Sequence, residues 1–195
     1  MKDLGRLITA MVTPFKNNGE VDFERAKEFA KALVNTGSDG LLIGGTTGES
    51  PSMSEGEKLE LFKSVKEAVG TTASVIAGTT DNNTIASIDL SKKAENLGVD
   101  AILLTVPAYN KPTQEGLFQH FKKISESVSI PGILYNVPSR TSLNMDVDTT
   151  IRLSKIDNIV GVKEASSDPD QITNIISKAD SDFKIWSGND NETFS

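Results

Sequence analysis

The sequence alternates between short apolar runs and longer amphipathic stretches with a period of roughly 30 residues. Apolar runs of about four to eight residues without polar alternation are typical of strands buried on both faces, as in parallel sheets. Such runs occupy residues 7–12, 40–44, 73–78, 101–106, 132–137, 159–163 and 183–187. The amphipathic stretches predict helices over 22–34, 54–69, 84–97, 114–128, 147–153 and 169–179. We therefore expect a chain of βαβ units.

The stretch 54–69 carries the clearest helix signals. Ser54 followed three residues later by Glu57 is a capping box, which predicts where the helix begins. An apolar stripe at helical spacing follows, formed by Leu61, Phe62, Val65 and Val69.

Two parallel architectures suit seven such units, a doubly wound sheet and a (β/α)8 barrel. The turn after the first run, Thr13-Pro14-Phe15, does not resemble the glycine-rich dinucleotide turn of a doubly wound fold. The regular repeat favours an α/β TIM-type (β/α)8 barrel, forming a single domain over residues 1–195. Because the sequence ends at Ser195, soon after the seventh run, strand 8 and the C-terminal helices are expected to be missing from it.

Composition excludes several classes of function. Lys plus Arg number 20 against 27 Asp plus Glu, a net charge of −7, which disfavours binding to nucleic acid or to an anionic membrane. The chain has no cysteine and one histidine, His120, so cysteine-based or histidine-rich metal sites and thiol or Ser/His catalysis lack parts. His120 is expected to be structural or on the surface. Without a membrane-length apolar run or a signal-peptide core, a cytoplasmic location is the expectation.

Lys163 is the most unusual polar residue, because it follows an apolar run that predicts a buried strand. Burial lowers the pKa of an ammonium group and supplies the neutral amine that forms a Schiff base with a carbonyl. The alternative is a lysine at the end of a strand that pairs with Glu164 or with a phosphate. Chemistry gathers at the carboxyl ends of parallel strands, so both interpretations place Lys163 near a site.

Three other segments at strand ends carry candidate groups. The loop Gly44–Glu49, with Thr46 and Thr47, offers backbone N–H groups at a helix start, which is typical of an anion site; the alternative is a tight turn with a threonine cap. Tyr109 and Tyr135 are the only tyrosines and could carry protons or simply pack. Arg140 could hold a carboxylate or remain a solvated loop charge. Together these groups suit carbon–carbon bond formation from a 2-oxo acid.

The segments Gly44–Glu49, Tyr135–Thr141 and Gly161–Ala165, with the opening Thr9–Phe15, are similar to motifs of the dihydrodipicolinate synthase family. That family belongs to the class I pyruvate-dependent aldolases, which include N-acetylneuraminate lyase. The resemblance covers the whole chain, in order. It implies a lyase that condenses pyruvate with L-aspartate 4-semialdehyde to give 4-hydroxy-tetrahydrodipicolinate, in diaminopimelate and lysine biosynthesis, with no metal or organic cofactor.

The resemblance also implies a role for each matching residue. Lys163 would form the Schiff base and Tyr135 would exchange protons beside it. Thr46 would link Tyr135 to Tyr109, which would reach in from a neighbouring subunit of a homodimer or homotetramer. The substrate-binding residues would be Thr47, Gly45 and Gly48 for the pyruvate carboxylate, Arg140 for aspartate semialdehyde, and Gly188 for the pocket lining.

Two alternatives remain open at this stage. One is another pyruvate-dependent aldolase, acting on 2-keto-3-deoxy sugar acids. The other is an inactive truncated fragment with an assembly or carboxylate-binding role. The family's lysine-inhibition site matches at Asn82 but departs at four positions, so weak or absent inhibition by lysine is expected. The departing positions are Glu55, Lys58, Ala86 and Ala108.

Overall fold

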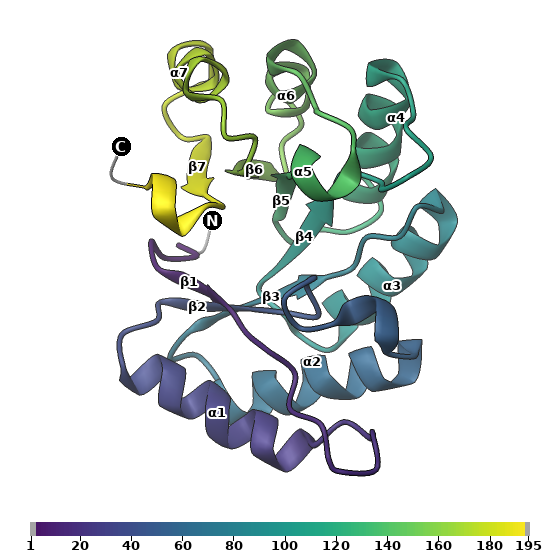
Figure 1. The fold of residues 1–195 in the computed structure, drawn as a ribbon, viewed down its shortest axis with the longest axis vertical. Coiled ribbons are helices and arrows are strands. Elements are labelled where there is room, and N and C mark those ends of the chain that lie inside the picture. Colours follow the sequence, from purple (N-terminus) through teal and green to yellow (C-terminus); the bar gives the residue numbers. More distant parts are fainter. Residues whose placement is uncertain (1–2, 194–195) are drawn as a thin grey trace. The chain divides into compact units, whose positions relative to one another are not determined.

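A computed structural model describes residues 3–193 of the chain (Figure 1). These residues fall into two compact units. The first unit holds the described residues up to Thr79 together with Leu90–Leu103, and the second holds Thr80–Asp89 and the described residues from Leu104 onward. Strand β4 (Ala101–Thr105) and helix α3 (Thr84–Asn96) each contribute residues to both units.

The first unit is built from two complete βα steps and the strand of a third, and helices α1 and α2 pack side by side in it (Figure 1). Its elements are β1 (Ile8–Ala10), α1 (Phe23–Asn35), β2 (Gly40–Ile43), the 3-10 helix η1 (Ser50–Ser52), α2 (Glu55–Val69) and β3 (Ser74–Gly78). The capping box at Ser54 forms as predicted, with hydrogen bonds in both directions to Glu57. The stripe at Leu61, Phe62, Val65 and Val69 is buried and forms much of this core.

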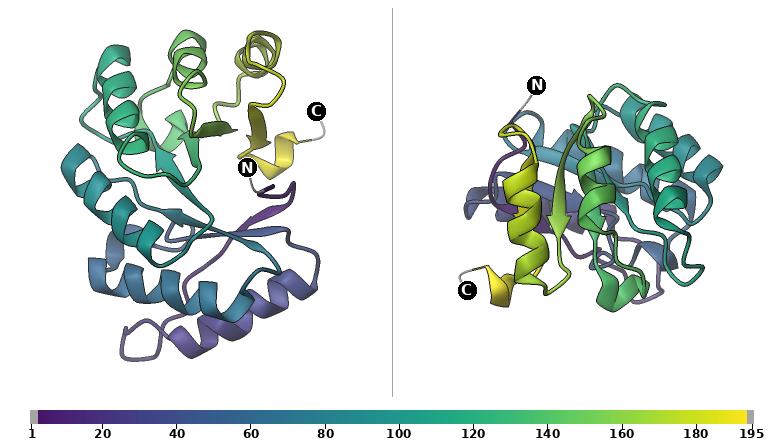
Figure 2. Two further views of the ribbon diagram at one scale, coloured as in Figure 1. Left: turned by 180° about the vertical axis from the view of Figure 1, so that it is seen from behind. Right: turned by 90° about the horizontal axis from the view of Figure 1, so that it is seen from above.

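The second unit continues the alternation of strand and helix. Its elements are α4 (Gln114–Ser125), β5 (Gly132–Asn136), α5 (Pro138–Thr141), α6 (Val147–Leu153), β6 (Ile159–Glu164), α7 (Pro169–Lys178), β7 (Lys184–Ser187) and the 3-10 helix η2 (Asp190–Glu192). Figure 2 shows α4, α6 and α7 in a row on one side of β5, β6 and β7. Phe121, Leu117 and Ile124 of α4 are fully buried there, each contributing roughly 1.5–3 kcal/mol of apolar burial.

The strands follow sequence order, β1-β2-β3-β4-β5-β6-β7, and the residue-level pairings that define the sheet are parallel. This is the order of seven units of a (β/α)8 barrel, and it confirms the predicted fold class. Every predicted strand and helix is present within a few residues of its expected bounds. Among the described residues, β1 and β7 each pair with one neighbour, and their side chains are partly exposed. The expectation that all seven strands are buried on both faces is therefore wrong for these two.

The pairing of β5 with β6 contains an irregularity that matters for the site. Gly132 pairs with Ile159 and Ile133 with Gly161, so Val160 is an extra residue on β6. Beyond this bulge, Tyr135 lies beside Lys163. The next pairing, of β6 with β7, places Lys163 beside Trp186. Without the extra residue the whole end of β6 would turn its side chains to the other face.

Candidate functional site

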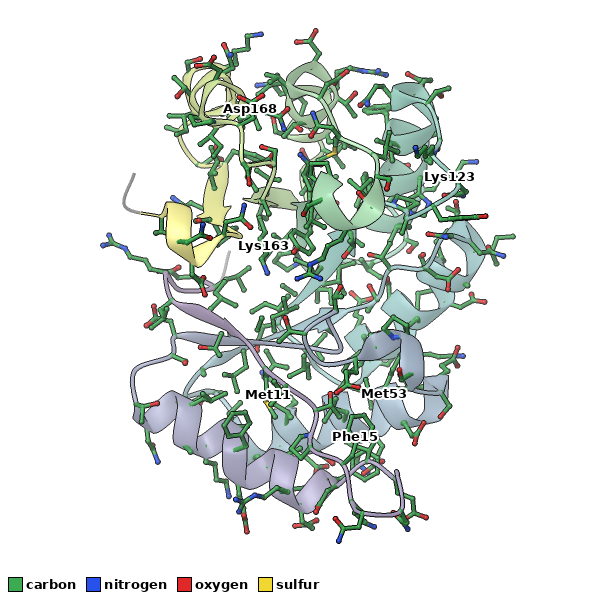
Figure 3. All side chains as sticks on the ribbon, in the orientation of Figure 1. Met11, Phe15, Met53, Lys123, Lys163 and Asp168 are labelled. Carbon is green, nitrogen blue, oxygen red and sulfur yellow. The ribbon has the colours of Figure 1, made fainter. Side chains whose placement is uncertain are left out.

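Lys163 and Tyr135 are neighbours on the same face of two paired strands. The Nζ atom of Lys163 lies 4.5 Å from the centre of the Tyr135 ring. Figure 3 shows the Lys163 side chain extending from β6 on the side away from α6 and α7. Alternation of side chains along a strand explains this placement, because in-register partners face the same side. The structure thus brings together the predicted nucleophile and the predicted proton carrier.

Burial controls the charge of Lys163. Desolvation lowers the pKa of its amino group, and the positive charge of Arg140 lowers it further, while the negative charge of Asp190 raises it. A lowered pKa increases the fraction of neutral amine at a given pH, and neutral amine is the form that attacks a carbonyl carbon. Asp190, in η2, was missed by the sequence reasoning, because nothing in its local pattern relates it to β6.

Tyr135 is 8% exposed, and burial raises the pKa of its phenol, partly offset by the charge of Arg140. The phenol therefore stays protonated near neutral pH and can donate a proton. Arg140 itself lies on the four-residue helix α5 and is exposed. Its charge acts on both Tyr135 and Lys163, so the structure groups these three residues.

Tyr109 lies in the loop after β4 and is 92% exposed, with a left-handed backbone at φ 72°. Its backbone N–H donates to the carbonyl oxygen of Thr141, the last residue of α5, at 3.2 Å. The packing alternative offered for the tyrosines therefore does not apply to Tyr109. Its hydroxyl is presented to the outside of this chain, next to the helix that carries Arg140.

Gly188 lies directly against Lys163, at the end of β7. Its N–H donates to the carbonyl oxygen of Glu164 at 2.7 Å. A Cβ atom at Gly188 would lie 2.7 Å from Cβ of Ala165 and 3.3 Å from Cε of Lys163. A larger side chain would fit here only if the neighbouring atoms moved, so the end of β7 lies close beside Lys163.

Glu164 does not pair with Lys163, which rules against the ion-pair alternative. Its side chain points to the opposite face of β6, where it is 2% exposed and accepts hydrogen bonds from Asn136, Gln171 and the N–H of Ser166. The sequence reasoning missed this buried polar group. The signal was available, because residues next to Lys163 and Tyr135 on a strand must face the other way.

The loop Gly44–Glu49 belongs to the first unit. The hydroxyl-bearing residues Thr46 and Thr47 are exposed, whereas Gly48 is buried and its carbonyl accepts from the Thr13 hydroxyl at 2.6 Å. Gly44 has φ 63°, and its carbonyl oxygen approaches Gly78 so closely that a Cβ there would be 2.4 Å away. These contacts fix the backbone that presents the two threonines.

The helix that follows the predicted anion loop is the short 3-10 helix η1, and α2 begins only at Glu55. The N–H groups of Gly48, Glu49 and Ser50 donate to carbonyl oxygens within the loop itself, at 3.0–3.3 Å. Pro51 and the left-handed Glu49 cause the interruption. Anion binding here would thus depend on Gly45, Thr46 and Thr47.

His120 has a structural place in the fold, which is one of the two alternatives expected from the sequence. It is 7% exposed, and its Nδ1 atom lies 2.9 Å from the Thr84 hydroxyl. Among residues 3–193 there is no group of three His, Asp or Glu side chains suited to a metal ion. Over the same residues no helix has the length and hydropathy needed to span a membrane.

The sequence is similar to one family of known proteins over almost its whole length. The model of the dihydrodipicolinate synthetase family matches residues 3–195. A 4-hydroxy-tetrahydrodipicolinate synthase of Dehalococcoides mccartyi is 57% identical over 193 residues, covering 99% of this chain and 65% of the relative. The chain thus spans about 65% of the length of such relatives.

Solved structures of the same family match the fold of this chain. A crystal structure of dihydrodipicolinate synthase DapA-2 from Bacillus anthracis matches with a TM-score of 0.98 at 49% identity, covering 100% of this chain and 66% of the other. A chloride-inhibited dihydrodipicolinate synthase from Acinetobacter baumannii, complexed with pyruvate, matches with a TM-score of 0.93 at 39% identity, covering 96% and 65%. These matches extend over almost all of the sequence, and we conclude that the chain belongs to the dihydrodipicolinate synthetase family.

Proposed function

We propose that this chain carries the Schiff-base chemistry of a 4-hydroxy-tetrahydrodipicolinate synthase. It would condense pyruvate, bound covalently at Lys163, with L-aspartate 4-semialdehyde, as a cytoplasmic step of diaminopimelate and lysine biosynthesis. The observation that carries the proposal is the half-buried amine of Lys163, whose Nζ atom lies 4.5 Å from the centre of the Tyr135 ring and whose pKa is lowered by desolvation. Family membership supports the choice of these two substrates.

The first half-reaction follows from ordinary amine chemistry. The neutral Lys163 amine adds to the ketone carbon of pyruvate, and the resulting carbinolamine loses water to give an iminium ion. The iminium withdraws electrons from the neighbouring methyl group, which loses a proton and becomes an enamine. Tyr135, with its raised pKa, is suited to donate the proton that makes water a leaving group. Because the imine itself accepts the electrons, this route needs no metal or organic cofactor.

The second half-reaction joins the two substrates. The enamine carbon attacks the aldehyde carbon of aspartate semialdehyde, and the aldehyde oxygen takes up a proton. The amino group of the same substrate then adds to the imine carbon and closes the ring. Its proton passes to the nitrogen of Lys163, whose bond to that carbon breaks, so that the lysine leaves as a neutral amine. Arg140 is exposed and its charge acts on both Lys163 and Tyr135, which supports a role in holding the second substrate's carboxylate.

The remaining assignments rest on the sequence motif rather than on geometry. Thr47, with Gly45, would hold the pyruvate carboxylate, and Gly48 would shape the loop, because its N–H donates to the carbonyl oxygen of Gly45. Thr46 would relay protons between Tyr135 and Tyr109. Gly188 would line the pocket, a role its contact with Lys163 supports. The 92% exposure of Tyr109 supports a homo-oligomer in which this side chain serves a neighbouring copy.

Borohydride trapping tests the proposal. Incubation with pyruvate and sodium borohydride should add one reduced pyruvate, and peptide mapping should place it on Lys163. Lys163→Met should abolish the adduct, whereas Lys184→Met, a change to an exposed lysine on β7, should leave it intact. An adduct on another lysine would refute the assignment. Trapping at Lys163 without turnover of aspartate semialdehyde would refute the second substrate only.

A further inference from the structure

Three buried polar side chains, together with the exposed Asn144, lie on the side of β5 and β6 opposite Lys163 and Tyr135. Asn136 follows Tyr135 on β5 and is 0% exposed, and Glu164 follows Lys163 on β6. With Asn144 and Gln171 they form a hydrogen-bonded group, which we name the acid–amide cluster. Its strand members face away from the Lys163 amine, and none of the roles proposed above uses it.

Glu164 is a buried carboxylate held by neutral donors. Nδ2 of Asn136 donates to its two oxygens at 3.0 and 3.2 Å, and Nε2 of Gln171 donates to Oε2 at 3.2 Å. The N–H of Ser166 donates to Oε1 at 2.8 Å. Burying a carboxylate is costly unless hydrogen bonds replace its hydration, so these donors must stay in place for Glu164 to remain there.

The cluster joins strand positions that are already in register. Asn136 and Glu164 are partners in the β5–β6 pairing, as are Tyr135 and Lys163 one residue earlier. A slip of one residue would turn Lys163 to the helix side and Glu164 to the reactive side. The bulge at Val160 shows that the pairing of β5 with β6 tolerates an extra residue. Hydrogen bonds between the side chains of Asn136 and Glu164 would therefore help to hold the observed register.

The same cluster also anchors the segment that carries Arg140. Oδ1 of Asn136 accepts from the N–H of Met145 at 3.0 Å, and its Nδ2 donates to Oδ1 of Asn144 at 2.8 Å. These bonds close the segment between Asn136 and Met145, within which α5 presents Arg140. Apart from the cluster, the main-chain carbonyl of Glu164 accepts from the N–H of Gly188, the residue after β7.

We propose that the acid–amide cluster is a positioning element that fixes Lys163 opposite Tyr135 and sets the segment bearing Arg140. The inference rests on the proposed function, because the position of Lys163 matters only if its amine forms the imine with pyruvate. Glu164 touches no reacting atom in this account. The charges that act on the Lys163 pKa are those of Arg140 and Asp190, so Glu164 works through the strand geometry.

Glu164→Gln is the primary variant, because it keeps the shape and removes one strong acceptor. Gln171→Met is a milder second variant. It removes one donor to Glu164 and keeps the hydrogen bonds between Asn136 and Glu164. Asn158→Ala is the matched control. It removes two hydrogen bonds, to the carbonyl oxygens of Ser125 and Val128, beside the opposite end of β6.

Two readouts are measured on the 195-residue chain after thermal unfolding has shown that each variant folds. The first is the rate of borohydride trapping with pyruvate. The second is the pH midpoint for labelling of Lys163 by a small amine reagent, which needs no substrate. The charged groups acting on Lys163, Arg140 and Asp190, are the same in every variant.

Glu164→Gln should slow trapping about 10–100-fold, the cost of a shift of about 1 Å, and should raise the labelling midpoint toward that of an ordinary lysine. Gln171→Met should change both in the same direction by less, and Asn158→Ala should change neither. A folded Glu164→Gln with wild-type values, or equal losses in Asn158→Ala, would overturn the inference. If Glu164→Gln does not fold, Gln171→Met decides by the same criteria. If the wild-type chain traps no pyruvate, the proposed function fails, and the labelling midpoint still decides the role of the cluster.

Discussion

Replacing Gly188 by alanine perturbs the contact between β7 and Lys163 with a single added methyl group. Gly188 does not have a positive φ, so alanine is compatible with its backbone. The added Cβ would lie 2.7 Å from Cβ of Ala165 and 3.3 Å from Cε of Lys163. Carbon atoms normally approach to about 3.5–4.0 Å, so the end of β7 or the lysine must move by about 1 Å.

The expected effects on rate and on stability differ in size. A displacement of about 1 Å at a reacting group costs about 100-fold in rate, which corresponds to about 2.7 kcal/mol in the barrier. Overpacking costs about 1–3 kcal/mol of stability. Because β7 is partly exposed and pairs with one strand among the described residues, we expect the lower end, about 1 kcal/mol. Gly188→Ala should therefore fold and yet form the imine slowly.

The assay is the rate of borohydride trapping at saturating pyruvate, measured alongside urea unfolding. Gly56→Ala is the control, since Gly56 lies in α2 and an added Cβ would meet no atom within 4 Å. It should leave trapping unchanged and raise the free energy of unfolding by about 0.5–1 kcal/mol. A folded Gly188→Ala protein that traps pyruvate at the wild-type rate would show that β7 does not constrain Lys163.

Four further predictions concern Lys163 and the first unit. Burial and the charge of Arg140 lower the pKa of Lys163 against the opposing charge of Asp190, so the trapping rate should rise with pH through a midpoint below the ordinary lysine pKa of about 10.4. At pH values between the folded and the unfolded pKa of Lys163, the unfolded chain binds more protons than the folded chain. The free energy of unfolding should therefore increase with pH across that range. Urea titrations at several pH values should show this increase in the wild type and not in Lys163→Met. Lys66→Met removes the ammonium whose Nζ atom lies 2.6 Å from Oδ2 of the mostly buried Asp100. The free energy of unfolding in urea should fall by about 1–3 kcal/mol. A fall below about 0.5 kcal/mol would contradict the importance of this pair. Ser54→Ala should cost about 1 kcal/mol in the same assay by removing the cap of α2, and an unchanged midpoint would refute that.

Periodicity predicted the elements of the fold well because each signal was local. The apolar runs gave all seven strands, and Ser54 with Glu57 gave the start of α2. The exposure of β1 and β7 could not be predicted in this way, because it depends on how many neighbours a strand has rather than on its own residues. The one-turn helix α5 was missed although Pro138 at its first position is a known helix-start signal.

The candidate site was only partly predictable. Lys163 and Tyr135 stood out because polar groups at the ends of apolar strands are unusual, and the structure places them side by side. The burial of Glu164 and the influence of Asp190 depend on contacts between segments far apart in sequence. The bulge at Val160, which decides the side to which Lys163 points, has no signature in the residues of β6 alone.

The pairing of Trp186 with Lys163 gives this protein a built-in optical reporter. Trp186 is the only tryptophan in the chain, and its ring lies so close to Gly161 that a Cβ there would be 2.6 Å from Cζ3. Its fluorescence therefore comes from a single known position on β7, next to the lysine in the register of the sheet. Because indole emission responds to nearby charge and water, conversion of the Lys163 amine into an iminium should be visible in real time without any added label.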